Sequence, residues 1–420
     1  MRNTSLLLRA SVIVAVAATQ FAMPVVAQEV AFKPLVDARL RYETVEQDGP
    51  APITKDRDAN AVTLRLRMGG ELSLGHWSAL AEAQGTLAID KDYNAFPFAV
   101  TNSQRRTQYP VVADPENIDL NRLQLQYKSQ AVTATIGRQR INLDDQRFVG
   151  SVGWRQNEQT FDAVRVEAKA GPVMVDGTYA ISQRSIYGIE AKQRQAYGGD
   201  FIFLQAGVKQ GPVTVKGFAY ILDYDEGFFF TNSSQTYGAR AVAVLPLSRT
   251  IKWTLTGSYA RQSDYGLNPV RYAADYVLAE AAVDYRGFKL TGGYELLGSD
   301  GRANFAFQTP MATLHKFNGW ADKFLTTPNT GLQDYYAGIG YSWPKVGNMG
   351  PLIAGFTFHR FDSDRANIHY GDEYNAQVSL KLNKQLTALV KYADYERQGI
   401  ASFAGDADTR KVWAEIDFAL

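Results

Sequence analysis

The 420-residue sequence contains no cysteine, so it can form neither a disulfide framework nor a thiolate metal site. Histidine is scarce, with four in all, and zincin, Walker and dinucleotide-binding glycine motifs are missing. The formal net charge is only +1, so no global excess of one sign points to nucleic acid. We therefore expect no cofactor, no metal site and no nucleic-acid partner.

Long hydrophobic runs are also missing after the first 27 residues. The start combines Arg2 and Arg9 with the apolar run ASVIVAVAATQFAM and a small-residue site ending in Ala27, which is typical of a secretory signal peptide spanning residues 1–27. A membrane anchor is the alternative, but a span needs roughly 18–20 uninterrupted apolar residues, and Gln20 interrupts this run. Residues 28–420 are therefore not expected to cross a membrane with helices.

What the mature sequence does have is a regular alternation of apolar and polar residues. In AVTLRLRMGGELSLG, residues 61–75, Leu64 and Leu66 share one parity, whereas Arg65 and Arg67 share the other. Similar segments recur to the end of the chain, separated alternately by short turns and long polar loops. With 23 Tyr, 22 Phe and 35 Gly, the mean hydropathy is still only −0.25, which suits strands that are apolar on one side only.

This pattern predicts an all-β fold: a transmembrane up-and-down antiparallel β-barrel of about eighteen strands in the cell outer membrane, surrounded by its lipid and lipopolysaccharide. Short turns would be periplasmic and long loops extracellular, and residues 28–420 would form a single domain. A strand within residues 299–331 would make the count odd, so we interpret them as a long loop, extracellular or folded inward as a constriction or lid. The C-terminal VWAEIDFAL resembles the assembly signal of such barrels, although its last residue is Leu420 rather than the usual Phe.

If the apolar parity faces lipid, the other parity lines a water-filled lumen, and Arg65 and Arg67 point into channel water. An excess of arginine and lysine on this parity favours anionic solutes. The alternative is that carboxylates on neighbouring strands pair with these cations and cancel their charge. The inward cations include Arg39, Arg41, Arg65, Arg67, Arg122, Lys128, Arg165, Lys169, Lys216, Arg240, Lys252, Lys289 and Lys391.

The segment IGRQRINLDDQRFVGSVGWRQNEQTFDAVRV, residues 136–166, carries more specific motifs. They are G-R-Q at 137–139, the acidic pair at 144–145, R-F-V-G at 147–150, W-R-Q at 154–156 and F-D-A at 161–163. This combination resembles the alginate export family of outer-membrane barrels. The segment HKFNGWADKF, which begins at His315, is similar to that family as well.

The resemblance implies a monomeric eighteen-stranded barrel with an electropositive pore, through which an anionic polysaccharide such as alginate, or its oligosaccharides, passes, with periplasmic export proteins as candidate partners. It places a charged cluster at the inner wall and on a folded-in loop, formed by Arg138, Arg140, Asp144, Asp145, Arg147 and Arg155. We expect two ion pairs to pin that loop, Asp145–Arg147 and Asp162–Arg155.

Two other classes of function remain open at this point. The first is a general or nutrient-specific porin for small solutes. The second is a barrel enzyme with a lipid substrate, for which His76 and Ser78 offer the residue types of a hydrolase, but they lie in or beside a short turn without a third orienting group. His315 and Asp322 alone are too little for a catalytic dyad. We therefore assign no catalytic residues and expect a passive channel rather than an enzyme.

Overall fold

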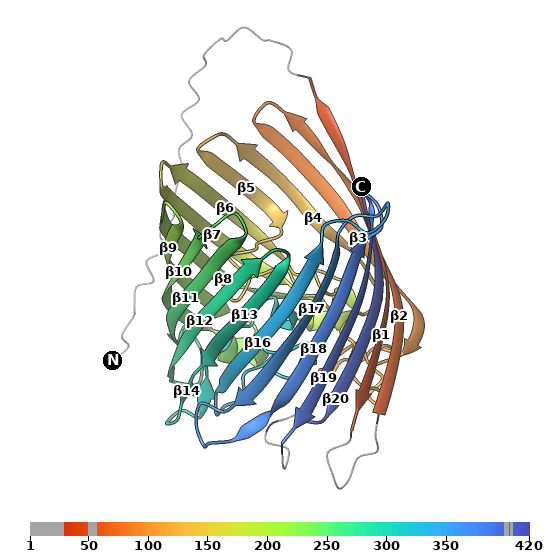
Figure 1. The fold of residues 1–420 in the computed structure, drawn as a ribbon, viewed down its shortest axis with the longest axis vertical. Coiled ribbons are helices and arrows are strands. Elements are labelled where there is room, and N and C mark those ends of the chain that lie inside the picture. The colour runs from red at the N-terminus through yellow and green to blue at the C-terminus, as the bar shows by residue number, and fades with distance from the viewer. Residues whose placement is uncertain (1–28, 49–56, 399–402, 404–405) are drawn as a thin grey trace, which may run out of the picture.

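A computed structural model describes residues 29–48, 57–398, 403 and 406–420, which form one closed antiparallel β-barrel (Figure 1). Its sheet has 18 strands in these residues, each paired with its neighbours along the chain, and β1 pairs with β20 to close it. This confirms the predicted fold class and strand number. The predicted signal peptide lies outside the described residues. No helix in the described part of the chain is long and apolar enough to span a bilayer.

The strands are long, and the loops hold only short helical or extended pieces. The barrel strands are β1 (Ala31–Gln47), β2 (Arg57–Leu74), β3 (Trp77–Asp92), β4 (Asn117–Lys128), β5 (Val132–Gln139), β6 (Thr160–Ala170), β7 (Val173–Arg184), β8 (Ala196–Gln210), β9 (Val213–Tyr224), β10 (Ser234–Pro246), β11 (Ile251–Asp264), β12 (Ala273–Tyr285), β13 (Phe288–Leu297), β16 (Leu332–Trp343), β17 (Leu352–Asp362), β18 (His369–Lys381), β19 (Leu386–Arg397) and β20 (Thr409–Ala419). The loop elements are η1 (Ile189–Arg194), η2 (Gly227–Asn232), η3 (Leu314–Lys316), β14 (Ser299–Asp300) and β15 (Phe305–Ala306).

The alternation in the sequence determines which side of each strand faces outward. On β2, Leu64 and Leu66 are 38% and 42% exposed on the outer surface, whereas Arg65 and Arg67 are 1% and 3% exposed. Successive side chains of a strand point to opposite faces, so a continuous apolar outer surface accompanies a polar interior. The apolar outer surface of the barrel therefore suits the hydrocarbon core of a bilayer.

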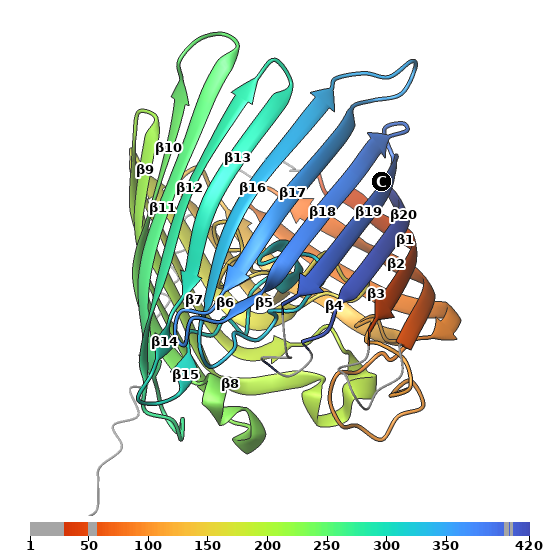
Figure 2. The same ribbon diagram turned by 60° about the horizontal axis from the view of Figure 1, so that its bottom comes forward.

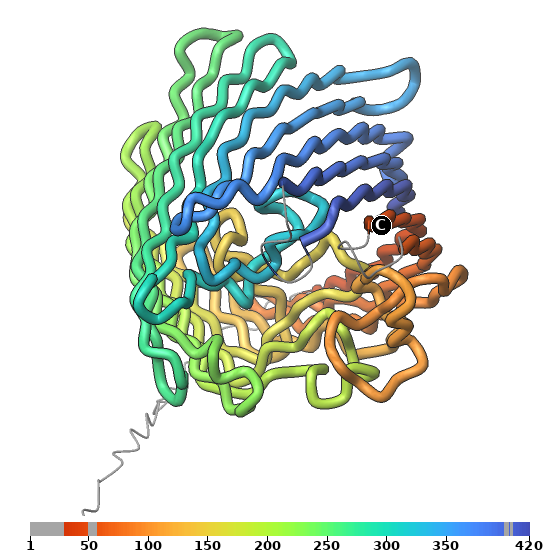
Figure 3. Tube along the Cα trace, turned by 90° about the horizontal axis from the view of Figure 1, so that it is seen from below, coloured from red at the N-terminus to blue at the C-terminus, as the bar shows by residue number. Residues whose placement is uncertain are grey.

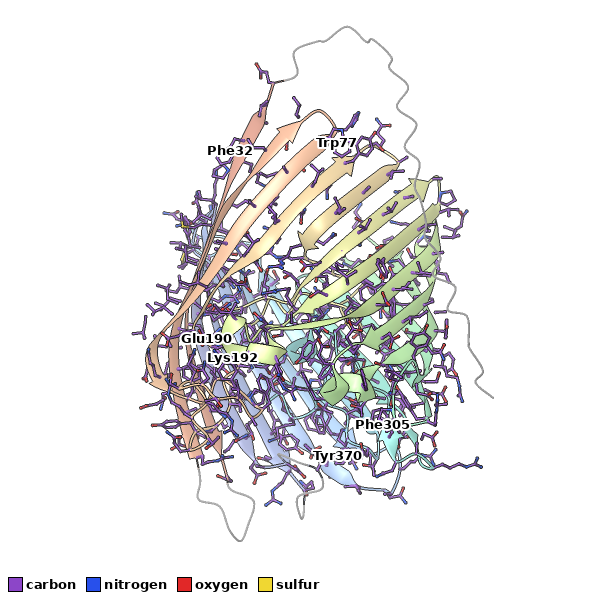
Figure 4. The ribbon with its side chains drawn as sticks, turned by 180° about the vertical axis from the view of Figure 1, so that it is seen from behind. Phe32, Trp77, Glu190, Lys192, Phe305 and Tyr370 are labelled. Carbon is purple, nitrogen blue, oxygen red and sulfur yellow. The ribbon has the colours of Figure 1, made fainter. Side chains whose placement is uncertain are left out.

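Short turns lie at one end of the barrel and long loops at the other (Figure 1). Gly171 and Gly211 both adopt φ 57° in two-residue turns, a left-handed backbone that favours glycine. At the other end, residues 298–331 contain the small β14–β15 hairpin and η3 and contribute no barrel strand, as the even count predicted. In Figure 4, Phe32 and Trp77 lie near the short-turn end, and Phe305 and Tyr370 lie near the long-loop end.

Two long loops, residues 140–159 and 298–331, fold into the barrel, and we call them together the plug. Figure 2 brings the long-loop end forward and Figure 3 looks into the ring from that end; in both, these yellow and cyan segments lie inside the strands. The two loops join each other, since Met311 O accepts hydrogen bonds from Gly150 N and Gln159 Nε2, both at 2.9 Å. Phe148 inserts between wall rings, 5.2 Å from both Phe218 and Tyr276. The plug therefore has its own packed core with the wall.

Candidate functional site

The closing seam of the barrel carries a ladder of arginines and carboxylates. Arg39 on β1 lies opposite Asp417 on β20 and donates to it at 2.7 Å. Arg41 lies opposite Glu415 and donates to it at the same distance. Directly opposed side chains of opposite charge stabilise a strand pair, so the charges on this part of the wall cancel one another.

The same arginines also hold the plug. Arg39 Nη1 donates to the main-chain oxygens of Gly153 and Trp154, at 3.1 and 2.9 Å, and Arg41 Nη2 donates to Trp154 O at 2.5 Å. Arg67 Nη2 reaches Gln156 O at 3.2 Å. The W-R-Q motif, recognised in the sequence as a family feature, is thus the part of the plug that the seam arginines bind.

The expectation that Arg65 and Arg67 point into channel water is wrong. Both face inward as predicted, but both are buried, and the plug covers Arg67. Arg67 Nη1 is paired with Glu158 of the plug at 2.6 Å, and Arg65 is paired with Asp37 on β1. Parity gives the side of the sheet that a residue faces, and it does not say what covers that residue.

Glu158 links the plug to β2 and to the strands that carry the family motif. Besides Arg67, it accepts hydrogen bonds from Arg140 and from Asn121 Nδ2, the latter at 3.1 Å. Glu82 on β3 pairs with Arg122 at 2.7 Å and Arg140 at 3.3 Å. One network therefore neutralises Arg67, Arg122 and Arg140 together.

The tip of the first plug loop rests on the opposite wall. Asp144 pairs with Lys216 on β9, and Asp145 pairs with Arg240 on β10 at 2.9 Å. Lys216 and Arg240 are direct partners in the sheet, so two adjacent carboxylates meet two adjacent cations. The acidic pair of the motif thus positions the tip.

The two predicted loop-pinning pairs are wrong in their partners. The guanidinium of Arg147 pairs with Glu295 on β13 at 2.7 Å, and the only group of Arg147 that Asp145 binds is the backbone N–H. Burial alone would lower the pKa of Arg147, but the carboxylate of Glu295 outweighs it and raises the pKa above its usual value. Arg147 also donates to two residues of the second plug loop, Thr309 and Asn318, at 3.1 and 3.0 Å.

Asp162 pairs with Arg138 at 2.8 Å rather than with Arg155. Arg155 pairs instead with Glu43 on β1 at 3.1 Å and with Asp322 of the second plug loop at 2.9 Å. Burial would lower the pKa of Arg155, but three neighbouring carboxylates, Glu43 first among them, raise it. The loop is pinned, as expected, although by acids far away in the sequence.

Most of the predicted pore-lining cations have a carboxylate partner, so the alternative of cancelled charge describes most of this wall. The remaining pairs are Arg165–Asp176 at 2.6 Å and Lys252–Asp284 at 2.8 Å, the latter exposed at the short-turn end. Lys289 is an exception, because it forms no ion pair with any described residue. The arginines of the wall therefore add little net positive charge to the lumen.

Two cavities open beside the plug. One of ≈ 640 Å³ is bounded by β10, β12, β13, β16–β18 and the second plug loop, and Lys289 and Trp320 line it. The other, of ≈ 540 Å³, is bounded by β4–β9 and the first plug loop, and Lys128 and Lys169 line it. Neither of these two lysines has an ion-pair partner among the described residues. Three uncompensated ammonium groups thus face space that a solute can enter.

Glycine widens the larger cavity. Gly340 on β16 pairs directly with Gly355 on β17, and Gly338 lies two residues along on the same inward parity. Tyr336 and Glu280 bound this patch, with the tyrosine hydroxyl donating to the carboxylate at 2.7 Å. Because glycine has no side chain, these positions leave open space at the inner wall, whereas the neighbouring strands place polar side chains there.

A second centre in the plug, which sequence reasoning missed, surrounds Trp154. The His315 ring stacks on this indole, with centroids 4.6 Å apart, and Lys391 Nζ lies 3.9 Å from its centroid and 3.8 Å from that of Trp320. Lys391 was predicted to face inward but had no assigned role. Its partners come from loops that are far apart in sequence, and only the shared family motifs hinted at them.

Two titratable plug residues at this centre are strongly perturbed. Burial, together with the ammonium of Lys391, holds the pKa of His315 well below its usual range. Burial would raise the pKa of Asp322, but Lys411, followed by His315 and Arg155, holds it well below its usual range.

The described residues contain no group of three or more His, Asp or Glu arranged to hold a metal ion. His76 lies in its short turn, 2.8 Å from the carbonyl of Lys128.

A closed barrel with an apolar exterior, polar interior and inward-folded loops is an outer-membrane channel of the porin type. The family model described as "Alginate export" matches residues 35–184, which span β1–β7 and the first plug loop. The resemblance to the alginate export family is thereby confirmed over that part of the chain. No curated protein matches the sequence.

Solved structures share the fold at low sequence identity. Pseudomonas aeruginosa OpdQ is 13% identical with a TM-score of 0.62, covering 93% of this chain and 98% of that one. Acinetobacter baumannii OccAB2 is 13% identical with a TM-score of 0.67, covering 92% and 98%. Pseudomonas aeruginosa OpdK, solved with vanillate, is 12% identical with a TM-score of 0.64, covering 93% and 98%.

Proposed function

We propose that this outer-membrane channel passes anionic saccharides, either a uronate polymer or its oligomers. The observation that carries the proposal is the set of lysines without ion-pair partners in the two cavities, Lys128, Lys169 and Lys289. A carboxylate that enters would be the counter-charge these ammonium groups lack, and each lysine is exposed enough to release it.

The contacts of the plug support the same cargo chemistry. Arg39 and Arg41 hold a row of main-chain oxygens, and Arg67 holds the carboxylate of Glu158. Oxygen acceptors spaced along a chain, with a carboxylate among them, are also what a polyuronate presents. We infer that the plug occupies the inner face that a passing uronate chain uses when the plug is displaced.

A porin for small carboxylates is the second candidate. The cancelled charge of the arginine ladder favours it, because a wall without strong net charge retains no long polyanion by itself. The structural neighbour solved with vanillate, an aromatic carboxylate, is consistent with it. Both candidates need the lysines, and they differ in the size of the cargo.

Planar-bilayer recordings with added solutes test the proposal. Uronate oligomers should interrupt the current at concentrations where neutral oligosaccharides of equal length do not, and replacing Lys128, Lys169 and Lys289 by Gln should weaken that block at least several-fold. The control is Lys384→Gln, in an exposed short turn. Block by vanillate alone would favour the small-solute porin, and no selective block by any carboxylate would overturn both.

A further inference from the structure

Lys391 on β19 contacts both loops of the plug through aromatic rings. Its ammonium lies 3.9 Å from the ring centroid of Trp154 in the first loop and 3.8 Å from that of Trp320 in the second. Trp413, its direct partner on β20, lies 5.4 Å away. A desolvated ammonium between indole faces is attracted to both rings by the cation–π interaction. This one side chain therefore ties both loops to the wall.

A hydrogen-bond relay continues from the ammonium into the second loop. Lys391 Nζ lies 2.9 Å from His315 Nε2, and His315 Nδ1 lies 2.8 Å from Asp322 Oδ1. An ammonium can only donate, so Nε2 accepts and Nδ1 carries the proton that is donated to Asp322. Asp322 in turn accepts from Lys411 on β20 at 2.8 Å. The relay fits only a neutral imidazole.

We propose that Lys391, His315 and Asp322 form a proton-sensitive latch that holds the plug against the wall, closed while His315 is neutral and released when its imidazole is protonated. A second proton, on Nε2, would set an N–H against the ammonium of Lys391 and remove the acceptor. The proposal rests on channel function alone and does not depend on the cargo.

Charged groups from every neighbouring element act on this imidazole. Lys391 of β19 and the plug residues Asp322 and Arg155 act on it directly. The charged groups around these three are Lys411 and Glu415 of β20, Arg41 and Glu43 of β1, Glu373 of β18, and Asp114 of the loop between β3 and β4. Asp322 and the face of Trp154 favour the imidazolium. Burial and the nearby Lys391 oppose it more strongly, because the pKa of His315 is held well below its usual range.

The lowered pKa of His315 determines whether acid opens or closes the channel. With the plug displaced, His315 is hydrated and its pKa returns to about 6.5, so the open state binds a proton that the closed state refuses. The closed state is therefore favoured above that pH and loses stability as pH falls. The ratio of open to closed channels should rise by about tenfold per pH unit below about 6.5, until the closed state also binds the proton.

Planar-bilayer conductance between pH 7.5 and 4.5, at constant salt, tests the latch. We expect the open probability of the wild type to rise on acidification, that of His315→Gln to stay flat, and His76→Gln, in a distant turn, to follow the wild type. Lys391→Met should raise open probability at pH 7.5 and weaken the pH response. Heat-modifiable mobility on gels establishes that each variant is a folded barrel.

Two results would overturn the latch. One is a His315→Gln channel with the full pH response of the wild type, which would place the titrating group elsewhere. The other is a folded Lys391→Met channel whose open probability and pH response both equal those of the wild type. Either result leaves the uronate experiment valid, and failure of uronate block with a pH response that depends on His315 would reject the cargo and keep the latch.

Discussion

His315 lies flat on the indole of Trp154, with the ring planes 2° apart and the centroids separated by 4.6 Å. The two residues belong to different loops and lie 161 positions apart along the chain. Because each ring also contacts Lys391, the stack joins both loops to β19.

Trp154→Ala should release the plug without unfolding the barrel. The substitution removes the stack on His315 and one face of the site around Lys391, and large-to-small changes of buried aromatics cost about 3–5 kcal/mol. We expect protease cleavage within residues 140–159 to become at least tenfold faster in folded protein. Trp77→Ala, on the exposed short-turn end, is the matched control and should leave the cleavage rate unchanged.

Arg147→Met should destabilise the plug by about 3–5 kcal/mol, because it leaves the buried carboxylate of Glu295 without its cation. Adding Glu295→Gln should restore part of the loss, which a double-mutant cycle on thermal midpoints in detergent measures. Arg271→Met removes an ion pair whose arginine is 82% exposed, and it should cost no more than about 1 kcal/mol. Equal losses in the two arginine variants would contradict this reading of the plug.

Asp322→Asn should weaken the plug in a pH-dependent way. Lys411, His315 and Arg155 hold the pKa of Asp322 well below its usual range, so its carboxylate stabilises the closed state above about pH 3.9 and loses that effect on further acidification. Thermal midpoints of the variant and the wild type should differ at pH 7, and the difference should be smaller at pH 2. A difference of the same size at both pH values would contradict the assignment.

Gly355→Phe should obstruct the larger cavity. A Cβ at this position would meet no atom closer than 3.8 Å, so the substitution fits the fold while the ring extends toward the cavity. We expect liposomes that contain this variant to swell several-fold more slowly in an oligosaccharide solution than liposomes that contain the wild type. Gly292→Phe is the control, since a Cβ there has no neighbour within 4 Å and the position faces outward on β13. Equal rates in both variants would show that solutes bypass this cavity.

The barrel could be predicted from the sequence because parity is a local property. The alternation of Leu64 and Arg65 is visible in neighbouring letters, and repetition of that pattern gave the strand number and the loop at 299–331. Partner choice is not local. Asp145 is the nearest acid to Arg147 in the sequence, yet Glu295, 148 positions away, is the carboxylate that reaches its guanidinium.

The contacts between the plug and the wall were beyond sequence reasoning for the same reason. Arg67 has the inward parity of a channel-lining cation, and nothing in β2 reveals that Gln156 and Glu158 cover it. The motif resemblance marked the loop that does so, without indicating its partners on the wall. Lys391 was one inward lysine among several, and only the fold shows that two loops meet at it.

The anchoring surface of the plug has a consequence for the order of events during biogenesis. Arg41 comes from the first strand, whereas Lys391 and Trp413 come from the last two, so the groups that grip Trp154 meet only when β1 and β20 join. A nascent barrel with an open seam can bind the loop tip through β9, β10 and β13, but it lacks the grip on Trp154. That part of the plug is therefore fixed only after the wall is closed.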